Sequence, residues 1–190
     1  MRPFVISSFV PAADGWRRNI WLALLVVVSV AFNVPFACAT PFAALATVAT
    51  MTLLWNEALI FMLAVWFANQ AVGFVLLDYP QTADSFIWGG IIGCSALIAT
   101  LVSRLVMLKF RKKSAALPSF LAVFLAAVIT YELTMFLAAL TPLGGLDGFT
   151  FAVIGRVVSI NILALAGLYG LNKIASGMGL MIKPEKLLVR

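Results

Sequence analysis

Glu132 and Arg156 are the ionisable residues that lie deepest in apolar sequence, in two segments joined by the glycine-rich turn 141–148. A charge at bilayer depth costs about 2.5 to 3.5 kcal/mol on insertion scales, so such residues face the protein interior, pair with each other or line a solute pathway. A guanidinium group binds a carboxylate through two parallel hydrogen bonds, and a glutamate accepts hydrogen bonds from cationic or donor groups. The two residues therefore predict either a site for a small polar molecule or a structural ion pair.

Further polar residues lie at a similar predicted depth. Counted from the ends of their segments, Glu132 and Arg156 differ in depth by about 4 to 5 Å at 1.5 Å per residue. Asn69 and Gln70, on the third apolar segment, lie at the same level. Taken singly, each of these two amides is also typical of a hydrogen bond between membrane helices. The complete set of predicted ligand-binding residues is Trp66, Asn69, Gln70, Trp88, Glu132, Arg156 and Ser159.

Aromatic and hydroxyl side chains complete this predicted site. Trp66 lies one helical turn from Gln70, and Trp88 enters from the outer end of the fourth segment, so either ring is expected to stack on a ligand. Ser159 shares a helix face with Arg156, three residues away. Asn161 is about 140° further round the same helix and is expected to make a helix contact instead.

The elements that must position these residues are membrane helices. The chain has 190 residues, of which 64% are hydrophobic and 11% charged, with a mean hydropathy of +1.11. The apolar residues come in blocks of about twenty, the length that crosses a bilayer. We therefore predict an all-α integral membrane protein built as a bundle of six transmembrane helices. The predicted segments are 19–34, 41–54, 56–77, 86–107, 118–140 and 149–171.

The charges predict the orientation and the organisation of the chain. With the N-terminus in the cytoplasm, six crossings place every lysine and arginine except Arg156 on the cytoplasmic side, as the positive-inside rule requires. Both termini are then cytoplasmic, and residues 1–18 form an interfacial leader, 19–171 the membrane domain and 172–190 a tail. The expected location is a bacterial plasma (inner) membrane. An alternative is a cleaved signal peptide, because Ala37-Cys38-Ala39 imitates a cleavage site; five spans would then remain.

The composition excludes several other classes of protein. There is no histidine, and the two cysteines lack the C-x-x-C spacing, so we expect no metal site and no cofactor. The chain has no G-x-S-x-G, no paired carboxylates on one segment and no phosphate-binding loop, so we expect no enzyme. The lysines and arginines adjoin membrane segments without interleaved aromatic residues, so we expect no nucleic-acid partner.

In architecture the chain resembles the substrate-binding S component of an energy-coupling factor (ECF) vitamin transporter. The resemblance lies in its size, the six predicted spans, the broken loop 33–41, and polar and aromatic residues in the outer half, including Trp66, Asn69, Trp88, Glu132 and Arg156. It implies binding of a vitamin-like nutrient near the outer face, with a transmembrane coupling subunit and ATPase subunits as partners. Such components commonly carry A-x-x-x-A on the first span, whereas here Ala23 is followed four residues later by Val27. A carrier that works alone therefore stays open.

Two hypotheses from different classes follow. The first is a membrane-embedded binding and uptake subunit in which Arg156 holds an acidic group, Glu132 a cationic or donor group, and Asn69 and Gln70 donate or accept hydrogen bonds. The second is a non-transporting assembly or scaffold subunit in which Glu132 and Arg156 form a structural ion pair.

Overall fold

The computed structural model describes residues 12–13, 15–36, 40–110 and 116–181. Within them the chain forms six α-helices and a short 3-10 turn, η1 (Leu146–Gly148), and no strand. The helices are α1 (Trp16–Phe36), α2 (Phe42–Thr52), α3 (Trp55–Leu76), α4 (Ala83–Phe110), α5 (Ala116–Ala139) and α6 (Phe151–Gly177). The predicted roles of Cys38, the basic run 111–113 and the tail from 182 fall outside the described residues.

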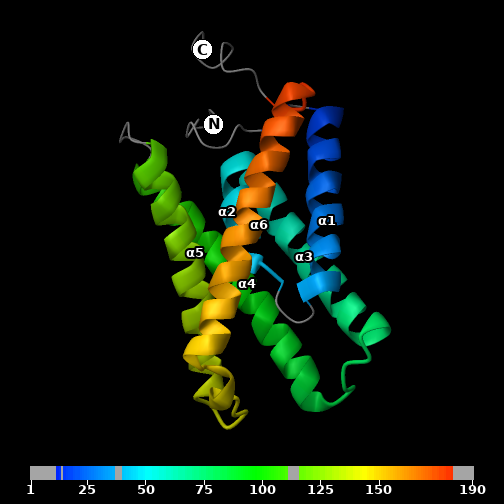
Figure 1. The fold of residues 1–190 in the computed structure, drawn as a ribbon, viewed down its shortest axis with the longest axis vertical. Helices are drawn as coiled ribbons and strands as arrows, with labels where there is room; N and C mark the ends of the chain where they lie inside the picture. The colour runs from blue at the N-terminus through cyan, green and yellow to red at the C-terminus, as the bar shows by residue number, and fades with distance from the viewer. Residues whose placement is uncertain (1–11, 14, 37–39, 111–115, 182–190) are drawn as a thin grey trace.

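Successive helices run in opposite directions through the bundle (Figure 1). At the upper end of that view, where α1 starts and α6 ends, Ala12 forms an antiparallel bridge with Met181, and the Ala13 amide donates to the Leu180 carbonyl over 2.9 Å. Four helices, α3 to α6, contain apolar stretches long enough to cross a membrane. The chain is therefore an all-α, multi-pass membrane protein.

Each predicted segment corresponds to one helix, with shifted ends. The helix α4 extends three residues beyond the predicted segment on each side, and α6 continues six residues past residue 171. These extensions are polar or amphipathic turns that a hydropathy pattern assigns to the surface, although their backbone remains helical.

The short helix α2 lies at the centre of the bundle. All eleven of its residues are buried, and it packs against α3, α4, α5 and α6. Its alanines, including Ala43, Ala46 and Ala49, let the neighbouring helices approach closely. At 1.5 Å per residue it is about 16 Å long, roughly half the thickness of a hydrocarbon core. It therefore starts inside the bundle and returns to the end from which α1 came.

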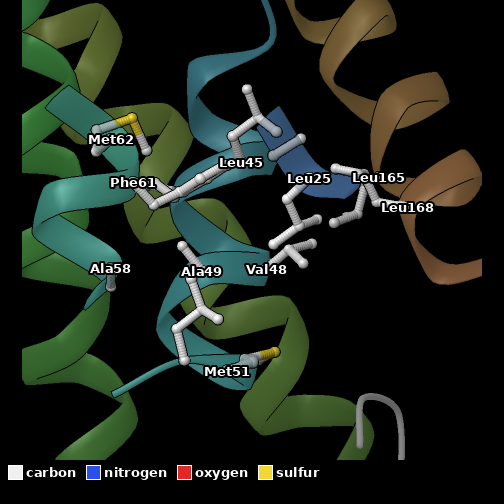
Figure 2. Close-up of a cluster of buried hydrophobic side chains, with 14 of the residues drawn as sticks. Leu25, Leu45, Val48, Ala49, Met51, Ala58, Phe61, Met62, Leu165 and Leu168 are labelled. Carbon is white, nitrogen blue, oxygen red and sulfur yellow. The ribbon is translucent and has the colours of Figure 1, made fainter. Parts of the chain in front are cut away.

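Apolar side chains from five helices enclose α2 (Figure 2). Leu45 and Val48 of α2 lie among Leu25 of α1, Phe61 of α3 and Leu168 of α6, all with at most 2% of their surface exposed. On the side of α5, the rings of Phe42 and Tyr131 stack with their centroids 5.9 Å apart. This core holds the start of α2 in one place relative to the longer helices.

Polar contacts fasten α1 to the junction between α2 and α3. The Trp21 indole donates to the Thr52 hydroxyl over 3.1 Å, and the Arg18 guanidinium lies 2.8 Å from the Glu57 carboxylate. The same carboxylate accepts a hydrogen bond from the Leu54 amide, which caps the first turn of α3. Arg18 is three-quarters buried at its side chain, so this ion pair is shielded from bulk solvent more than a surface pair.

The two ends of the bundle differ in charge. The turn between α3 and α4, the first turn of α4 and η1 carry the exposed residues Asp78, Asp84 and Asp147. The opposite end carries Arg17, Arg18, Lys109 and Lys173. The described residues thus separate an acidic end from a mainly basic end.

Candidate functional site

Asn69 is on α3, and its side chain lies against the start of the short helix α2. Its side chain is 9% exposed, and its amide nitrogen donates to the Thr40 hydroxyl, just before α2 begins. The Gln70 side-chain nitrogen in turn donates to the side-chain oxygen (Oδ1) of Asn69 over 3.1 Å. The structure thus brings two of the predicted residues together with Thr40 in one hydrogen-bonded group, in which Asn69 and Thr40 are buried and Gln70 is half-buried.

Trp66 and Gln70 lie against the two glycines of the G-x-x-x-G run on α4. The Trp66 indole donates to the Gly89 carbonyl over 2.8 Å. A Cβ atom added to Gly93 would lie 2.7 Å from the indole nitrogen, and one added to Gly89 would overlap the Gln70 side chain. Only glycine at these two positions leaves room for the side chains from α3. Both predicted residues therefore fix the contact between α3 and α4.

Trp88 packs on the turn between α5 and α6. Its ring lies 3.0 Å from the position that a Cβ atom on Gly145 would occupy. Gly145 has φ of +99° and Gly144 has φ of +70°, the left-handed backbone conformation that favours glycine. The tryptophan therefore covers a turn at the acidic end, and its side chain is half-buried.

Glu132 lies on α5 next to the aromatic contact with α2. It directly follows Tyr131, which stacks on Phe42, and points about 100° away from it around the helix. It is half-buried and lies on the same stripe as the exposed residues Leu121 and Leu125. Within the described part of the chain its carboxylate has no hydrogen bond and no ion pair.

Arg156 and Ser159 lie on the outward face of α6. Both side chains are exposed, whereas Asn161 and Leu168 on the opposite side are buried. The Ser159 hydroxyl donates to the Gly155 carbonyl over 2.7 Å, one turn earlier in the same helix. The Arg156 guanidinium contacts no carboxylate and no hydrogen-bond acceptor among the described residues.

The expected ion pair between Glu132 and Arg156 is not formed in the structure. Residue counting places the two residues at similar depth, but they lie on different helices, and the Arg156 side chain is on the exposed part of α6. The seven predicted residues therefore fall into four places: an interior group on α3 (Trp66, Asn69 and Gln70), a turn contact at Trp88, Glu132 on α5, and Arg156 with Ser159 on α6.

Asn161 is the polar residue with the clearest structural role that was not included in the predicted set. Its side-chain oxygen accepts a hydrogen bond from the Ala44 amide of α2 over 2.9 Å, and its nitrogen donates to the Val157 carbonyl over 3.0 Å. This contact confirms that Asn161 faces a neighbouring helix. An amide side chain within a buried, otherwise apolar stripe was the signal available in the sequence.

Two open grooves lie on the apolar surface of the bundle. One, between α4 and α5, includes Cys94 and Thr134; the other, between α3 and α4, includes Trp55 and Leu101. None of the seven predicted residues lines either groove. The described residues also contain no cluster of three or more His, Cys, Asp or Glu side chains that could hold a metal ion.

Comparison of the chain with known protein families, with curated proteins and with solved structures finds no match.

Proposed function

We propose that the protein is a membrane-embedded binding subunit for the uptake of a small, vitamin-like nutrient. In this proposal the chain enters a bacterial inner membrane with six helical segments, of which α2 extends through only about half of the hydrocarbon core. The basic end is cytoplasmic, and the nutrient enters from the acidic, outer end.

The position of the start of α2 carries this proposal. A helix that begins inside a membrane bundle directs backbone amides and the positive end of its dipole toward the interior. Transporters use such half-length helices at their substrate sites, near the middle of the bilayer. Here the start of α2 is fully buried and is surrounded by Thr40, Asn69 and Asn161, which come from three different segments.

The interior group on α3 is the proposed contact surface for the nutrient. Asn69 offers an amide that is already held by Thr40, and Gln70 adds a second amide beside it. A polar ligand with hydrogen-bond donors and acceptors fits these groups, and Trp88 lies nearer the proposed entrance. Rearrangement of the contact between α3 and α4 would open the site, because Trp66 and Gln70 close it in the structure described here.

The proposed subunit obtains energy from its partners. It has no phosphate-binding loop, so ATP hydrolysis would come from separate ATPase subunits acting through a transmembrane coupling subunit, as the resemblance to ECF S components implies. The helix α1 lacks the A-x-x-x-A pattern that such components commonly carry on the first span. Uptake by the chain alone, without a coupling subunit, is therefore an alternative within the same proposal.

The test is direct ligand binding to the purified full-length protein. Small molecules extracted from the protein are identified by mass spectrometry and titrated back by calorimetry. Asn69→Leu removes the side-chain amide of α3 that lies against the start of α2, and Asn56→Leu is the matched control, because Asn56 is exposed near the beginning of α3. We expect Asn69→Leu to weaken binding at least about ten-fold and the control to bind like the wild type.

The same measurements include outcomes that contradict the proposal. Equal affinity of the wild type and Asn69→Leu would exclude the proposed site, provided that circular dichroism shows both to be folded. A wild-type preparation that carries no small molecule, and whose melting temperature no water-soluble vitamin raises, would exclude the function.

A non-transporting scaffold subunit is the second candidate, and one observation favours it. Trp66 and Gln70 are occupied by contacts with α4, as expected of residues that only hold helices together. Under this alternative, Trp66→Phe lowers the melting temperature, and any cellular phenotype follows the amount of folded protein. Under the binding proposal, Trp66→Phe changes ligand affinity at an unchanged amount of folded protein.

A further inference from the structure

Arg156 is a cation at membrane depth on the outward face of its helix. It lies five residues from the start of α6, about 8 Å along the helix axis. Its side chain is exposed and has no ion pair or hydrogen bond among the described residues. Such a charge facing lipid is costly, and membrane proteins reduce this cost by pairing it with an opposite charge.

The chain itself carries an opposite charge at nearly the same depth. Glu132 lies seven residues before the end of α5, about 10 Å along the axis, so the two depths agree to within about 3 Å. It is half-buried on the edge of the exposed face of α5 and, in the described part of the chain, also lacks an ion pair. Among the described residues, Arg156 therefore lacks an anionic partner and Glu132 lacks a cationic one, and each could serve as the partner of the other.

The two charges lie on opposite flanks of α6. Arg156 shares a stripe with Gly167, eleven residues further along, and an added Cβ atom at Gly167 would face Phe32 of α1 at 4.0 Å. Arg156 therefore leaves α6 on its α1 side. Glu132 belongs to α5, and Figure 1 shows α6 running between α5 and α1. The outward face of α6 separates the two charges within one molecule.

That outward face contains a row of small residues among larger apolar ones. To one side of Arg156 the exposed residues include Ala152, Gly155, Ser159 and Ala166, whereas Leu163 and Ile174, which are also exposed, lie within about 20° of Arg156 around the helix. An added Cβ atom at Gly155 would have no neighbour within 4 Å. Small residues spaced by four, such as Gly155 and Ser159, let two membrane helices approach closely. The row of small residues therefore allows another helix to approach α6 closely, beside the larger exposed side chains of Leu163 and Ile174.

We propose that this face binds a second copy of the same chain, as a two-fold symmetric dimer. A two-fold axis parallel to the helices brings α6 of one subunit against α6 of the partner subunit. The α1 side of each α6 then faces the α5 side of the other subunit. Arg156 of each subunit then faces Glu132 of the other subunit, giving two reciprocal ion pairs. In a medium of low dielectric constant both charges gain from this arrangement. A helix from a different protein would satisfy Arg156 but would leave Glu132 unpaired, which favours the second copy.

This inference does not rest on the proposed function. It assigns Glu132 and Arg156 to contact between subunits, whereas the proposed nutrient site uses the interior group around Asn69. A failure of nutrient binding would leave the dimer intact, and loss of the dimer in a charge variant would leave Asn69 in place.

The test measures association of the full-length protein in lipid vesicles. Separately donor- and acceptor-labelled protein is reconstituted at increasing dilution in lipid, and energy transfer reports the fraction of dimer. We expect Glu132→Lys and Arg156→Glu each to weaken association at least about ten-fold, and the double exchange Glu132→Lys with Arg156→Glu to restore most of it. Ser159→Leu should also weaken association, whereas Ala71→Leu, an exposed alanine on α3, is the matched control.

Neutral variants guard against misfolding. Glu132→Gln and Arg156→Gln keep similar shapes, and their helix content and melting temperature are measured in parallel. Weaker association of folded neutral variants supports the dimer. A wild type that stays monomeric at every dilution, a dimer that is insensitive to both charges, or a double exchange that restores nothing would each overturn it.

Discussion

The side-chain oxygen of Asn161 in α6 accepts a hydrogen bond from the backbone amide of Ala44 in α2, across 117 positions in the sequence. The amide belongs to the first turn of α2, where backbone N–H groups have no partner within the helix. Helix caps normally come from the residue just before the helix, but Pro41 precedes α2 and makes no side-chain cap. A side chain from the last helix takes over that role.

Replacing Asn161 by alanine should therefore destabilise the bundle. The change leaves the buried Ala44 amide without an acceptor, which costs about 1 to 3 kcal/mol. Unfolding of the purified protein by denaturant in detergent, followed by circular dichroism, measures the difference. Asn56→Ala, at an exposed position on α3, should change stability by less than about 0.5 kcal/mol. Equal stability of the two variants would contradict the capping role.

Gly93→Ala should destabilise the packing of α3 against α4. The added methyl group would lie within 2.7 Å of the Trp66 indole, and overpacking of this kind costs about 1 to 3 kcal/mol. Gly90→Ala is the matched control on the same helix, because a Cβ atom there meets nothing within 4 Å. The denaturant midpoint should fall for the first variant and stay within error for the second. The double variant Gly93→Ala with Trp66→Phe should lose less stability than the sum of the losses in the two single variants.

Gly145→Ala should loosen the turn between α5 and α6. An alanine there is strained by φ of +99° and also crowds the Trp88 ring, so we expect a loss of about 1 to 2 kcal/mol. Gly148→Ala, in the same turn and with open space around its Cβ position, should have little effect. Protection of the turn from proteolysis in vesicles provides the measurement. Similar cleavage rates for both variants would contradict the contact with Trp88.

The proposed orientation predicts which end of the bundle meets the cytoplasm. In a background with Cys38→Ser and Cys94→Ser, Gln81→Cys reports the acidic end and Asn56→Cys the basic end. A membrane-impermeant maleimide added to intact cells should label Gln81→Cys and should reach Asn56→Cys only after permeabilisation, as positive-inside topology requires. The opposite labelling pattern would reverse the proposed direction of loading.

The long helices could be predicted because hydropathy alone determines where a chain can cross a membrane. The start of a short second helix after Pro41 was also expected, whereas the first helix continues through Pro35 to Phe36, beyond the predicted end at residue 34. Depth along each helix was estimated from residue counting, which places Glu132 and Arg156 within about 5 Å of each other on the predicted segments and within about 3 Å on the observed helices.

The direction in which each side chain points could not be predicted, because it depends on which neighbours a helix has. Arg156 was expected to face inward, since a lone charge in an apolar segment is normally buried, yet α6 uses the opposite side to pack on α2. Trp66 and Gln70 are spaced by four residues, as are Gly89 and Gly93. That matching spacing predicts a ridge fitted into a groove, but only once α3 and α4 are known to be adjacent.

The complete burial of α2 has a consequence for biosynthesis. A helix of eleven residues cannot cross the bilayer by itself, and α2 packs mainly on α3, α4, α5 and α6, which are all synthesised later. Its first turn gains its cap only when Asn161 has left the ribosome. In nascent chains that end before α6, α2 should therefore be incompletely packed and sensitive to protease. The centre of the bundle is completed only when α6 has entered the membrane.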